Sequence, residues 1–235
     1  MCTRYISPEA GDIERHWHIG ARNTTPWARD VFPRYPAPFI RAAPGGVEGE
    51  RELVVGQWSL VPWFATSPKL AYATCNARAE ELSAKASYKL PWARGQRCIV
   101  PAALFFEPNW QSGQHVPWCF KRADGGLWGL AGLFNTWTDK ASGEQVESFT
   151  LLTLNADDHP LMNRMHRPDP KRPPALQDKR SVVPIELGDV DEWLSAPVAQ
   201  AARLVRLAPP EAFDAAPAGL DLGPAQRRAG PPGVE

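Results

Sequence analysis

The stretch RCIVPAALFFE, residues 97–107, is a run of apolar and β-favouring residues that ends on a carboxylate and is followed by proline. Short runs rich in Val, Phe, Trp or Thr and bounded by Gly, Pro or Asn are typical of β-strands. Four other runs have the same character: ELVVGQWSLVPWF (52–64), HVPWCFKR (115–122), GLWGLAGLFNTW (126–137) and ESFTLLTLNA (147–156). The glycines within residues 125–134 predict a bulge or a sharp bend in that strand.

Three segments have helical character: residues 7–19, 77–95 and 184–197. In the first, we expect Ser7 to be the N-cap and Pro8 to take the first helical position. The second is rich in good helix formers and is expected to end near Pro91. Many short strands with few helices predict an α+β fold, a single domain with a curved, barrel-like, mostly antiparallel sheet and a few flanking helices.

The composition sets the extent of the domain and its charge. Hydrophobic residues make up 43% of the 235 residues, enough for one sizeable core in residues 1–207. Pro, Ala and Gly then account for 17 of the last 28 residues, so we expect a mobile tail over residues 208–235. Lys plus Arg equals Asp plus Glu at 26 each, so binding of a polyanion requires a local basic patch.

The four cysteines are widely spaced and form no Cys-x-x-Cys pair, which argues against a zinc ribbon or a thioredoxin-type site. No signal peptide and no run of 18 apolar residues is visible, so we expect a cytoplasmic protein without a membrane span. Cys75, Cys98 and Cys119 are then expected to be free, half-buried thiols. His16 and His18 have no carboxylate or cysteine in register, so no metal site and no cofactor are predicted.

Cys2 directly follows the initiator methionine. Removal of Met1 leaves a 1,2-aminothiol, a pairing of amine and thiol that can close on an aldehyde to give a five-membered ring. The alternative is that residue 2 has no special role and the N-terminus frays.

Two further positions combine reactive side chains with restricted surroundings. Glu107 ends an apolar strand, where a carboxylate is either functional or turned to solvent at the strand end. His166 lies among loop formers and close in sequence to the only basic cluster of the chain, formed by Arg164, Arg167, Lys171 and Arg172. Neighbouring cations disfavour the protonated imidazole, so we expect a neutral histidine fit for proton transfer; a solvated charged loop is the alternative.

Asn76 and Arg78 lie in TCNARAEE, residues 74–81, a pattern that predicts the start of a helix. Asn76 then serves as the N-cap. Together with Arg78, the helix start can also bind a phosphate or a carboxylate.

Six pieces, in order, resemble the SOS response-associated peptidase (SRAP) family, whose members crosslink to abasic sites in single-stranded DNA. They are MCTRY (1–5), WSLVPWF (58–64), NARAE (76–80), RCIVPAALFFE (97–107), GLAGLF (129–134) and HPLMNRMH (159–166). The resemblance covers most of residues 2–194. It implies a reaction in which the amine of mature Cys2 attacks the abasic aldehyde and the thiol closes the Schiff base to a thiazolidine.

The resemblance also implies roles for residues singled out above. Catalytic roles go to Cys2, Asn76, Glu107 and His166: Asn76 orients the N-terminal cysteine, Glu107 is the acid–base group and His166 acts on the sugar oxygen. The DNA-contacting residues are Arg4, Trp63, Phe64, Arg78, Arg164 and Arg167. The implied partner is single-stranded DNA containing abasic sites, bound by a monomer that associates with the nucleoid when DNA is damaged.

Four places depart from the family pattern. Thr3 replaces the usual glycine after the cysteine, and YPAPF (35–39) lacks the asparagine of the family loop. The tryptophan that follows the glutamate is displaced to Trp110, and residues 167–185 carry extra prolines. These departures leave the nucleophile and the acid–base residues intact but alter loops expected to contact DNA.

Two other functions are compatible with the same residues. A cysteine peptidase or N-terminal-nucleophile hydrolase would use Cys2 as nucleophile and His166 as base, and could remove Met1 itself. A non-catalytic single-strand-binding module would use the tryptophans and the basic loop, and its binding would survive Cys2→Ala.

Overall fold

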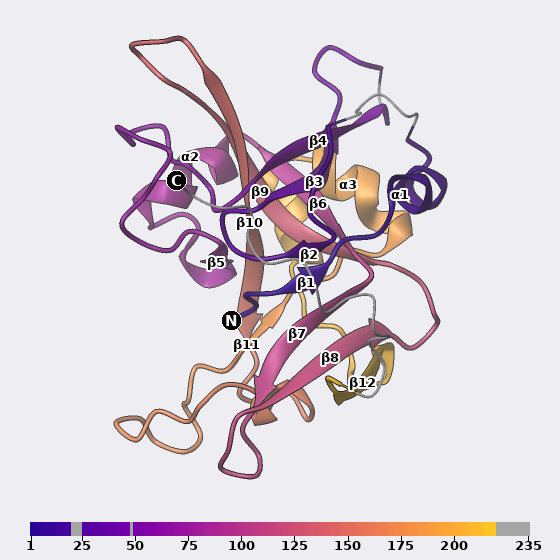
Figure 1. Ribbon diagram of the computed structural model, residues 1–235, viewed down its shortest axis with the longest axis vertical. Coiled ribbons are helices and arrows are strands. Elements are labelled where there is room, and N and C mark those ends of the chain that lie inside the picture. Colours follow the sequence, from indigo (N-terminus) through magenta and orange to yellow (C-terminus); the bar gives the residue numbers. More distant parts are fainter. Residues whose placement is uncertain (20–24, 48, 220–235) are drawn as a thin grey trace.

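The computed structural model describes residues 1–19, 25–47 and 49–219 (Figure 1). The strands are β1 (Tyr5–Ile6), β2 (Asp30–Val31), β3 (Pro36–Ala42), β4 (Arg51–Trp58), β5 (Asn76–Arg78), β6 (Arg97–Ala102), β7 (Leu104–Asn109), β8 (Val116–Arg122), β9 (Trp128–Thr138), β10 (Gln145–Asn155), β11 (Arg180–Val182) and β12 (Phe213–Pro217). The α-helices are α1 (Ala10–Trp17), α2 (Ala86–Ala93), α3 (Val190–Ser195) and α4 (Val198–Ala201). Short 3₁₀ helices are η1 (Ala79–Glu81), η2 (Met162–Arg164), η3 (Leu187–Asp189), η4 (Ala202–Leu204) and η5 (Pro210–Ala212).

The strands form two sheets, as the α+β prediction requires. Strands β10, β4, β3, β6 and β9 pair in that order, and β9 pairs back with β10, so these five strands close into a barrel. Strands β5 and β11 extend it along β10. The second sheet has the order β12-β8-β7-β1-β2 and is antiparallel throughout. Among the described strands, only the β10 pairings with β4 and β5 are parallel, so the predicted curved and mostly antiparallel architecture is confirmed.

The stretch RCIVPAALFFE forms two strands rather than the single strand predicted. Residues 97–102 are β6 in the barrel, and residues 104–109 are β7 in the second sheet. Ala103 alone joins them, and its N–H donates to the Ile6 carbonyl of β1. The chain therefore passes from one sheet to the other within one residue and places the end of β7 beside the N-terminus.

Aromatic packing fastens the two sheets together. Phe105 of β7 stacks on Phe120 of β8 at 5.0 Å between ring centroids, and its ring meets Trp128 of the barrel edge-on at 5.9 Å. All three side chains are buried. Each buried aromatic ring contributes roughly 1.5–3 kcal/mol or more through removal of apolar surface from water. This aromatic cluster therefore fixes the second sheet against the barrel.

The glycines of β9 have a different cause from the predicted bulge. The β9 register with β6 and with β10 runs without interruption. A Cβ at Gly132 would lie 2.6 Å from the Thr150 carbonyl oxygen and 2.8 Å from the Cys98 Sγ. Glycine is required there because neighbouring strands approach too closely for any side chain.

Several helix boundaries differ from those predicted. Helix α1 begins at Ala10 with Glu9 as its N-cap, and the Ser7 hydroxyl donates to the Pro8 carbonyl instead of capping the helix. Residues 77–95 form η1 and, separately, α2, which continues to Ala93 with Pro91 inside it. Predicting one helix was wrong, because the first residues of this segment pair with β10.

The domain extends beyond the predicted boundary at residue 207. Phe213–Pro217 form β12, which pairs antiparallel with β8, and Phe213 joins the aromatic cluster at 5.3 Å from Trp128. Strand pairing and the partly buried Phe213 side chain together dock a segment whose composition is otherwise that of a tail. Residues 220–235 of the predicted tail lie outside the described residues. Across the described ranges, no helix has the length and apolar character needed to cross a membrane.

Candidate active site at the N-terminus

The segment that follows Met1 is held by the second sheet. Strand β1 lies between β2 and β7, with Tyr5 opposite both Val31 and Phe105. Cys2 is completely buried, and its Sγ lies 3.4 Å from the Arg4 carbonyl oxygen. The frayed terminus considered as an alternative is therefore contradicted: the sheet fixes the position of the cysteine.

Asn76 contacts the N-terminal cysteine directly. Its Nδ2 donates to the Cys2 carbonyl oxygen at 2.7 Å and to the Cys75 Sγ at 3.4 Å. The predicted helix start at this position is wrong, because Asn76 begins strand β5 and pairs with Leu151 of β10. Tertiary strand pairing overrides the local capping preference, and the amide is thereby directed at the backbone of Cys2.

Glu107 and His166 form a hydrogen-bonded pair beside the N-terminal amine. Glu107 is 2% exposed, which rules out the strand-end carboxylate turned to solvent. Its Oε2 lies 2.7 Å from the His166 Nε2 and 3.5 Å from the Met1 ammonium nitrogen. The Met1 nitrogen also hydrogen-bonds the His166 Nε2. A carboxylate and an imidazole at an amine can carry protons to and from that amine.

The surroundings of the imidazole differ from those expected. The partner of Nε2 is the Glu107 carboxylate rather than a cation of the basic cluster. His166 has a left-handed backbone conformation, with φ of 61°, which is uncommon for a residue with a side chain. Its N–H donates to the Pro108 carbonyl at 2.7 Å, so β7 holds the histidine next to the glutamate.

Lys179 holds the other side of the histidine backbone and was missed in the sequence. Its Nζ donates to the carbonyl oxygens of Met165 at 2.7 Å and His166 at 2.5 Å, and the residue is only 6% exposed. Burial lowers the pKa of this ammonium, and the Asp157 carboxylate opposes that effect. The one available signal was a lysine at the point where the proline-rich segment returns to a strand.

The Cys2 thiol is held in its neutral form. Burial and then the negative charge of Glu107 raise its pKa well above the usual range. Burial also raises the pKa of Cys75. None of the four cysteines forms a disulfide within the described residues, and Cys75, Cys98 and Cys119 are buried rather than half-buried as expected.

A cavity of about 340 Å³ opens beside the N-terminus. Its walls include Met1, Asn76 and Arg78, with Tyr72 and Tyr88 as aromatic neighbours. It is the space through which a substrate can reach the N-terminal residue. The described residues contain no cluster of three or more side chains suited to holding a metal ion.

The two arginines expected to bind phosphates both have acidic partners. Arg4 makes a two-point contact with Asp30, at 2.9 and 2.7 Å, and its guanidinium lies 4.2 Å from the Phe106 ring centroid. Arg78 pairs with Asp178 and lies 3.6 Å from Glu81. Both side chains remain partly exposed, at 31% and 39%.

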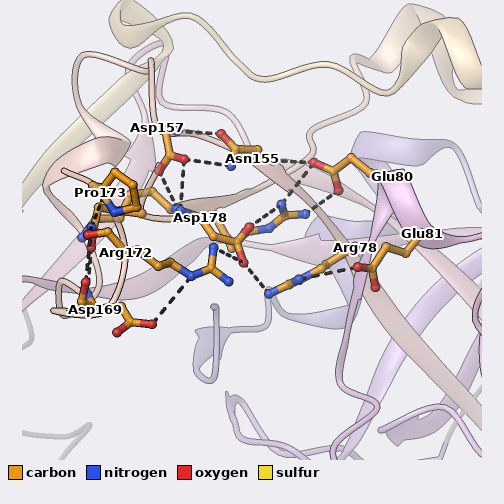
Figure 2. Close-up of polar contacts among 12 residues, drawn as sticks. Arg78, Glu80, Glu81, Asn155, Asp157, Asp169, Arg172, Pro173 and Asp178 are labelled. Carbon is orange, nitrogen blue, oxygen red and sulfur yellow. Dashed lines mark hydrogen bonds and ion pairs between the residues drawn. The ribbon is translucent and has the colours of Figure 1, made fainter. Parts of the chain in front are cut away.

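Asp178 connects the loop after the histidine to the strand that carries Asn76 (Figure 2). Its carboxylate contacts Arg78 of β5, Arg180 of β11 at 3.2 Å and Arg172 of the loop at 3.7 Å. Asp178 also adopts a left-handed conformation, with φ of 57°. The network therefore connects the loop that follows His166 to strand β5, which carries Asn76.

The remaining predicted DNA-contacting residues are on the surface. Trp63 is 61% and Phe64 is 41% exposed, and their rings meet edge-on at 5.7 Å. Arg164 and Arg167 are exposed on either side of His166 in sequence, and Arg167 lies 5.5 Å from the Trp110 ring centroid. Exposed flat rings of this kind can stack on nucleic-acid bases.

Known proteins are similar to part of this chain in sequence. A curated relative, the abasic site processing protein HMCES of Gallus gallus, is 28% identical over 190 residues, covering 70% of this chain and 52% of the relative. The abasic site processing protein YoqW of Bacillus subtilis (strain 168) is 33% identical over 111 residues, covering 47% of this chain and 48% of the relative. The chain thus spans about half the length of these curated relatives.

Solved structures match over nearly the whole chain. A protein from Bordetella bronchiseptica has a TM-score of 0.81 and 32% identity, and the match covers 93% of this chain and 100% of that protein's chain. A protein from Bacteroides thetaiotaomicron has a TM-score of 0.71 at 22% identity, covering 92% and 90% of the two chains, and shares the fold. The family model described as SOS response associated peptidase (SRAP) matches residues 1–221. The chain belongs to the SRAP family.

Proposed function

We propose that this protein processes abasic sites in single-stranded DNA by forming a thiazolidine between Cys2, after removal of Met1, and the ring-opened abasic sugar. One observation carries the proposal: the Glu107–His166 pair contacts the amine of Met1, the residue directly before a fixed and buried Cys2. The names of the curated relatives, abasic site processing proteins, agree with this chemistry.

The reaction releases one water. The Cys2 amine attacks the aldehyde carbon, and Glu107 accepts a proton from the attacking nitrogen. Glu107 returns that proton to the aldehyde oxygen to give the carbinolamine, and transfer of the second N–H proton to the resulting hydroxyl lets it leave as water and gives a neutral Schiff base. The Cys2 sulfur then bonds to the imine carbon, and the thiol proton ends on the nitrogen. The ring contains both former nucleophiles, so the adduct is more durable than an imine.

The other residues hold the reactants in place. Asn76 keeps the Cys2 backbone fixed through its 2.7 Å hydrogen bond. His166 donates to the sugar oxygen as the ring opens, and shares its proton with Glu107 through their 2.7 Å contact. Because Met1 lines the cavity, its removal leaves the new amine at the cavity wall.

The exposed residues supply the DNA contacts. Trp63 and Phe64 stack on bases next to the lesion, as exposed aromatic side chains do in single-strand-binding proteins. Arg4, Arg78, Arg164 and Arg167 contact phosphates. For the first two, a phosphate joins or replaces the carboxylate that each now contacts.

A second activity, removal of Met1 by the protein itself, is favoured by the contact of the Met1 amine with His166 and Glu107. In this hydrolysis, water adds to the Met1 carbonyl carbon, the Met1–Cys2 bond breaks and the proton goes to the Cys2 amine. Protein translated in the presence of a methionine aminopeptidase inhibitor should lose Met1 over time, measured by intact mass. The Glu107→Gln variant should keep it, and equal loss in both would assign the step to another enzyme.

The proposed crosslink is tested with protein whose Met1 is shown to be absent by intact mass. It is mixed with a single-stranded oligonucleotide that carries one abasic site, and a denaturing gel reports any heat-stable covalent species. A shifted band that requires the lesion supports the proposal. A protein with a free N-terminal cysteine that gives no band contradicts it.

Lys179→Met should lower the crosslinking rate at saturating DNA by about 10- to 100-fold, because a misplacement of the imidazole by about 1 Å has effects of that size. DNA affinity should fall much less than the rate, since Lys179 is buried and its ammonium contacts two backbone carbonyls. Single-turnover gels and anisotropy measure the two quantities separately. Partial recovery in Lys179→Arg supports a positioning role, whereas an equal loss of affinity in Lys179→Met argues for direct DNA contact.

A further inference from the structure

Two of the departures from the family pattern meet in space. Trp110 and the proline-rich segment after His166 line a common cleft of about 670 Å³, a volume within the range of small-molecule sites. The cleft adjoins the reaction site, because Arg164 and Pro168 flank His166 in sequence and Lys179 contacts its carbonyl.

Backbone contacts hold the two walls of the cleft together. The Trp110 N–H donates to the Arg164 carbonyl at 2.9 Å, and Asn109 pairs with Met165 in an isolated β-bridge. The opposite end of the loop is fixed by the Asp178 network (Figure 2). The cleft is therefore formed before any ligand arrives.

The unpartnered polar groups of the cleft can bind a ligand that carries both a negative charge and a hydrogen-bonding group. Asn163 and Arg164 are exposed, and neither side chain has a hydrogen-bond or ion-pair partner within the part of the chain that is described. The Trp110 indole supplies an aromatic wall, and the Arg167 guanidinium lies 5.5 Å from its centroid.

The acidic residues of the cleft already have partners within the protein. Asp157 accepts the backbone N–H groups of Asp178 at 3.0 Å and Lys179 at 2.8 Å. Asp169 accepts the Lys171 N–H at 2.9 Å and lies 3.6 Å from the Arg172 guanidinium. With both carboxylates engaged in these contacts, Arg164 remains available to a ligand.

We infer that this cleft binds the nucleotide next to the abasic site on one side of the lesion. Its phosphate contacts Arg164, and its base lies along Trp110 with its polar edge toward Asn163. Because the cleft adjoins His166, a strand that places its lesion at Cys2 and His166 can continue past this loop, which gives the ligand its identity. The inference rests on the proposed function and adds a flanking-nucleotide site in which Trp110 and the proline-rich loop, both departures from the family pattern, lie beside Asn163 and Arg164.

The test is equilibrium binding of mature protein to labelled oligonucleotides that carry a tetrahydrofuran abasic analogue. The analogue has no aldehyde, so binding is measured apart from the crosslinking chemistry. Three oligonucleotides are compared: one with both flanks, one trimmed just 5′ of the lesion and one trimmed just 3′ of it.

On the oligonucleotide with both flanks, Arg164→Gln should weaken binding about tenfold and Trp110→Leu about fivefold or more. Both losses should vanish on the same trimmed oligonucleotide and persist on the other. Arg203→Gln, at an exposed arginine that does not line the cleft, should bind all three like the wild type.

Three results would overturn the cleft assignment: losses that persist on all three oligonucleotides, no loss in either variant, or losses that depend on opposite flanks. Wild-type protein that binds none of the oligonucleotides overturns it together with the proposed function. Wild-type protein that shows the expected flank dependence but forms no crosslink with a natural abasic site contradicts only the crosslinking proposal.

Discussion

Cys2→Ser should abolish the heat-stable crosslink to abasic DNA, a loss of at least about 100-fold in the yield that survives heating. The serine hydroxyl of the variant does not close the ring, so the reaction stops at the Schiff base. That intermediate hydrolyses or undergoes β-elimination. The α-amine is unchanged, so treatment with sodium borohydride should still trap a covalent species. Gels run with and without the reductant, on matched samples, measure both forms.

The same comparison distinguishes the crosslinking proposal from a binding module. A DNA-affinity measurement is the control for a disrupted fold. The affinity should match that of the wild type because the Cys2 side chain is buried. Cys119→Ser, at a buried thiol of β8, is the matched control and should crosslink normally. A Cys2→Ser variant that still gives the heat-stable adduct without reductant would contradict thiazolidine formation.

Glu107→Gln should lower the rate of crosslinking by about 10²- to 10⁴-fold, the usual contribution of a positioned acid–base group. The amide keeps the shape of the side chain but cannot accept the proton of the attacking amine. It also removes the carboxylate from a buried position 2.7 Å from the His166 Nε2. Single-turnover kinetics at saturating DNA report the change without interference from binding.

The matched control for this variant is Glu186→Gln, at an exposed glutamate that pairs with Arg122. It should crosslink at the wild-type rate. Glu107 and His166 share a hydrogen bond, so the combined loss in Glu107→Gln/His166→Gln should be smaller than the product of the two single losses. A Glu107→Gln variant within threefold of the wild-type rate would exclude the proposed acid–base role.

Local patterns predicted the strands better than their connections. Short apolar runs bounded by turn formers identified β4 and β6 to β10, because each strand buries at least one face. The passage from β6 to β7 at Ala103 has no local signal, since both strands are apolar and no turn residue separates them. Only pairing with two different sheets divides the run.

The helix errors have a similar origin. Ser7 has the chemistry of an N-cap, but its N–H donates to the Arg29 carbonyl, and the helix starts only after β1 has left the sheet. Asn76 likewise has a good capping side chain, yet β10 offers it a strand partner. The helix-capping propensity of the side chain gives the wrong prediction at both positions, because long-range hydrogen bonds decide the backbone conformation.

Site residues could be predicted where a reactive side chain occupies an unusual position in the sequence. Cys2 behind Met1 and a carboxylate at the end of an apolar strand are unusual enough to be singled out. The contact of Glu107 with His166 joins residues 59 positions apart and cannot be inferred from spacing. Lys179 was missed because its role depends on burial beneath a loop, and a lysine within a charged run gives no sign of that.

The most direct test of the central claim is the mass of the crosslinked N-terminal peptide after protease and nuclease digestion. Thiazolidine formation predicts the Cys2 peptide plus the abasic nucleotide remnant minus one water, with a sulfur that iodoacetamide cannot alkylate. Borohydride should leave the mass of this adduct unchanged. An adduct on any other residue, or one at Cys2 that is reduced by borohydride and alkylated at sulfur, would contradict the account.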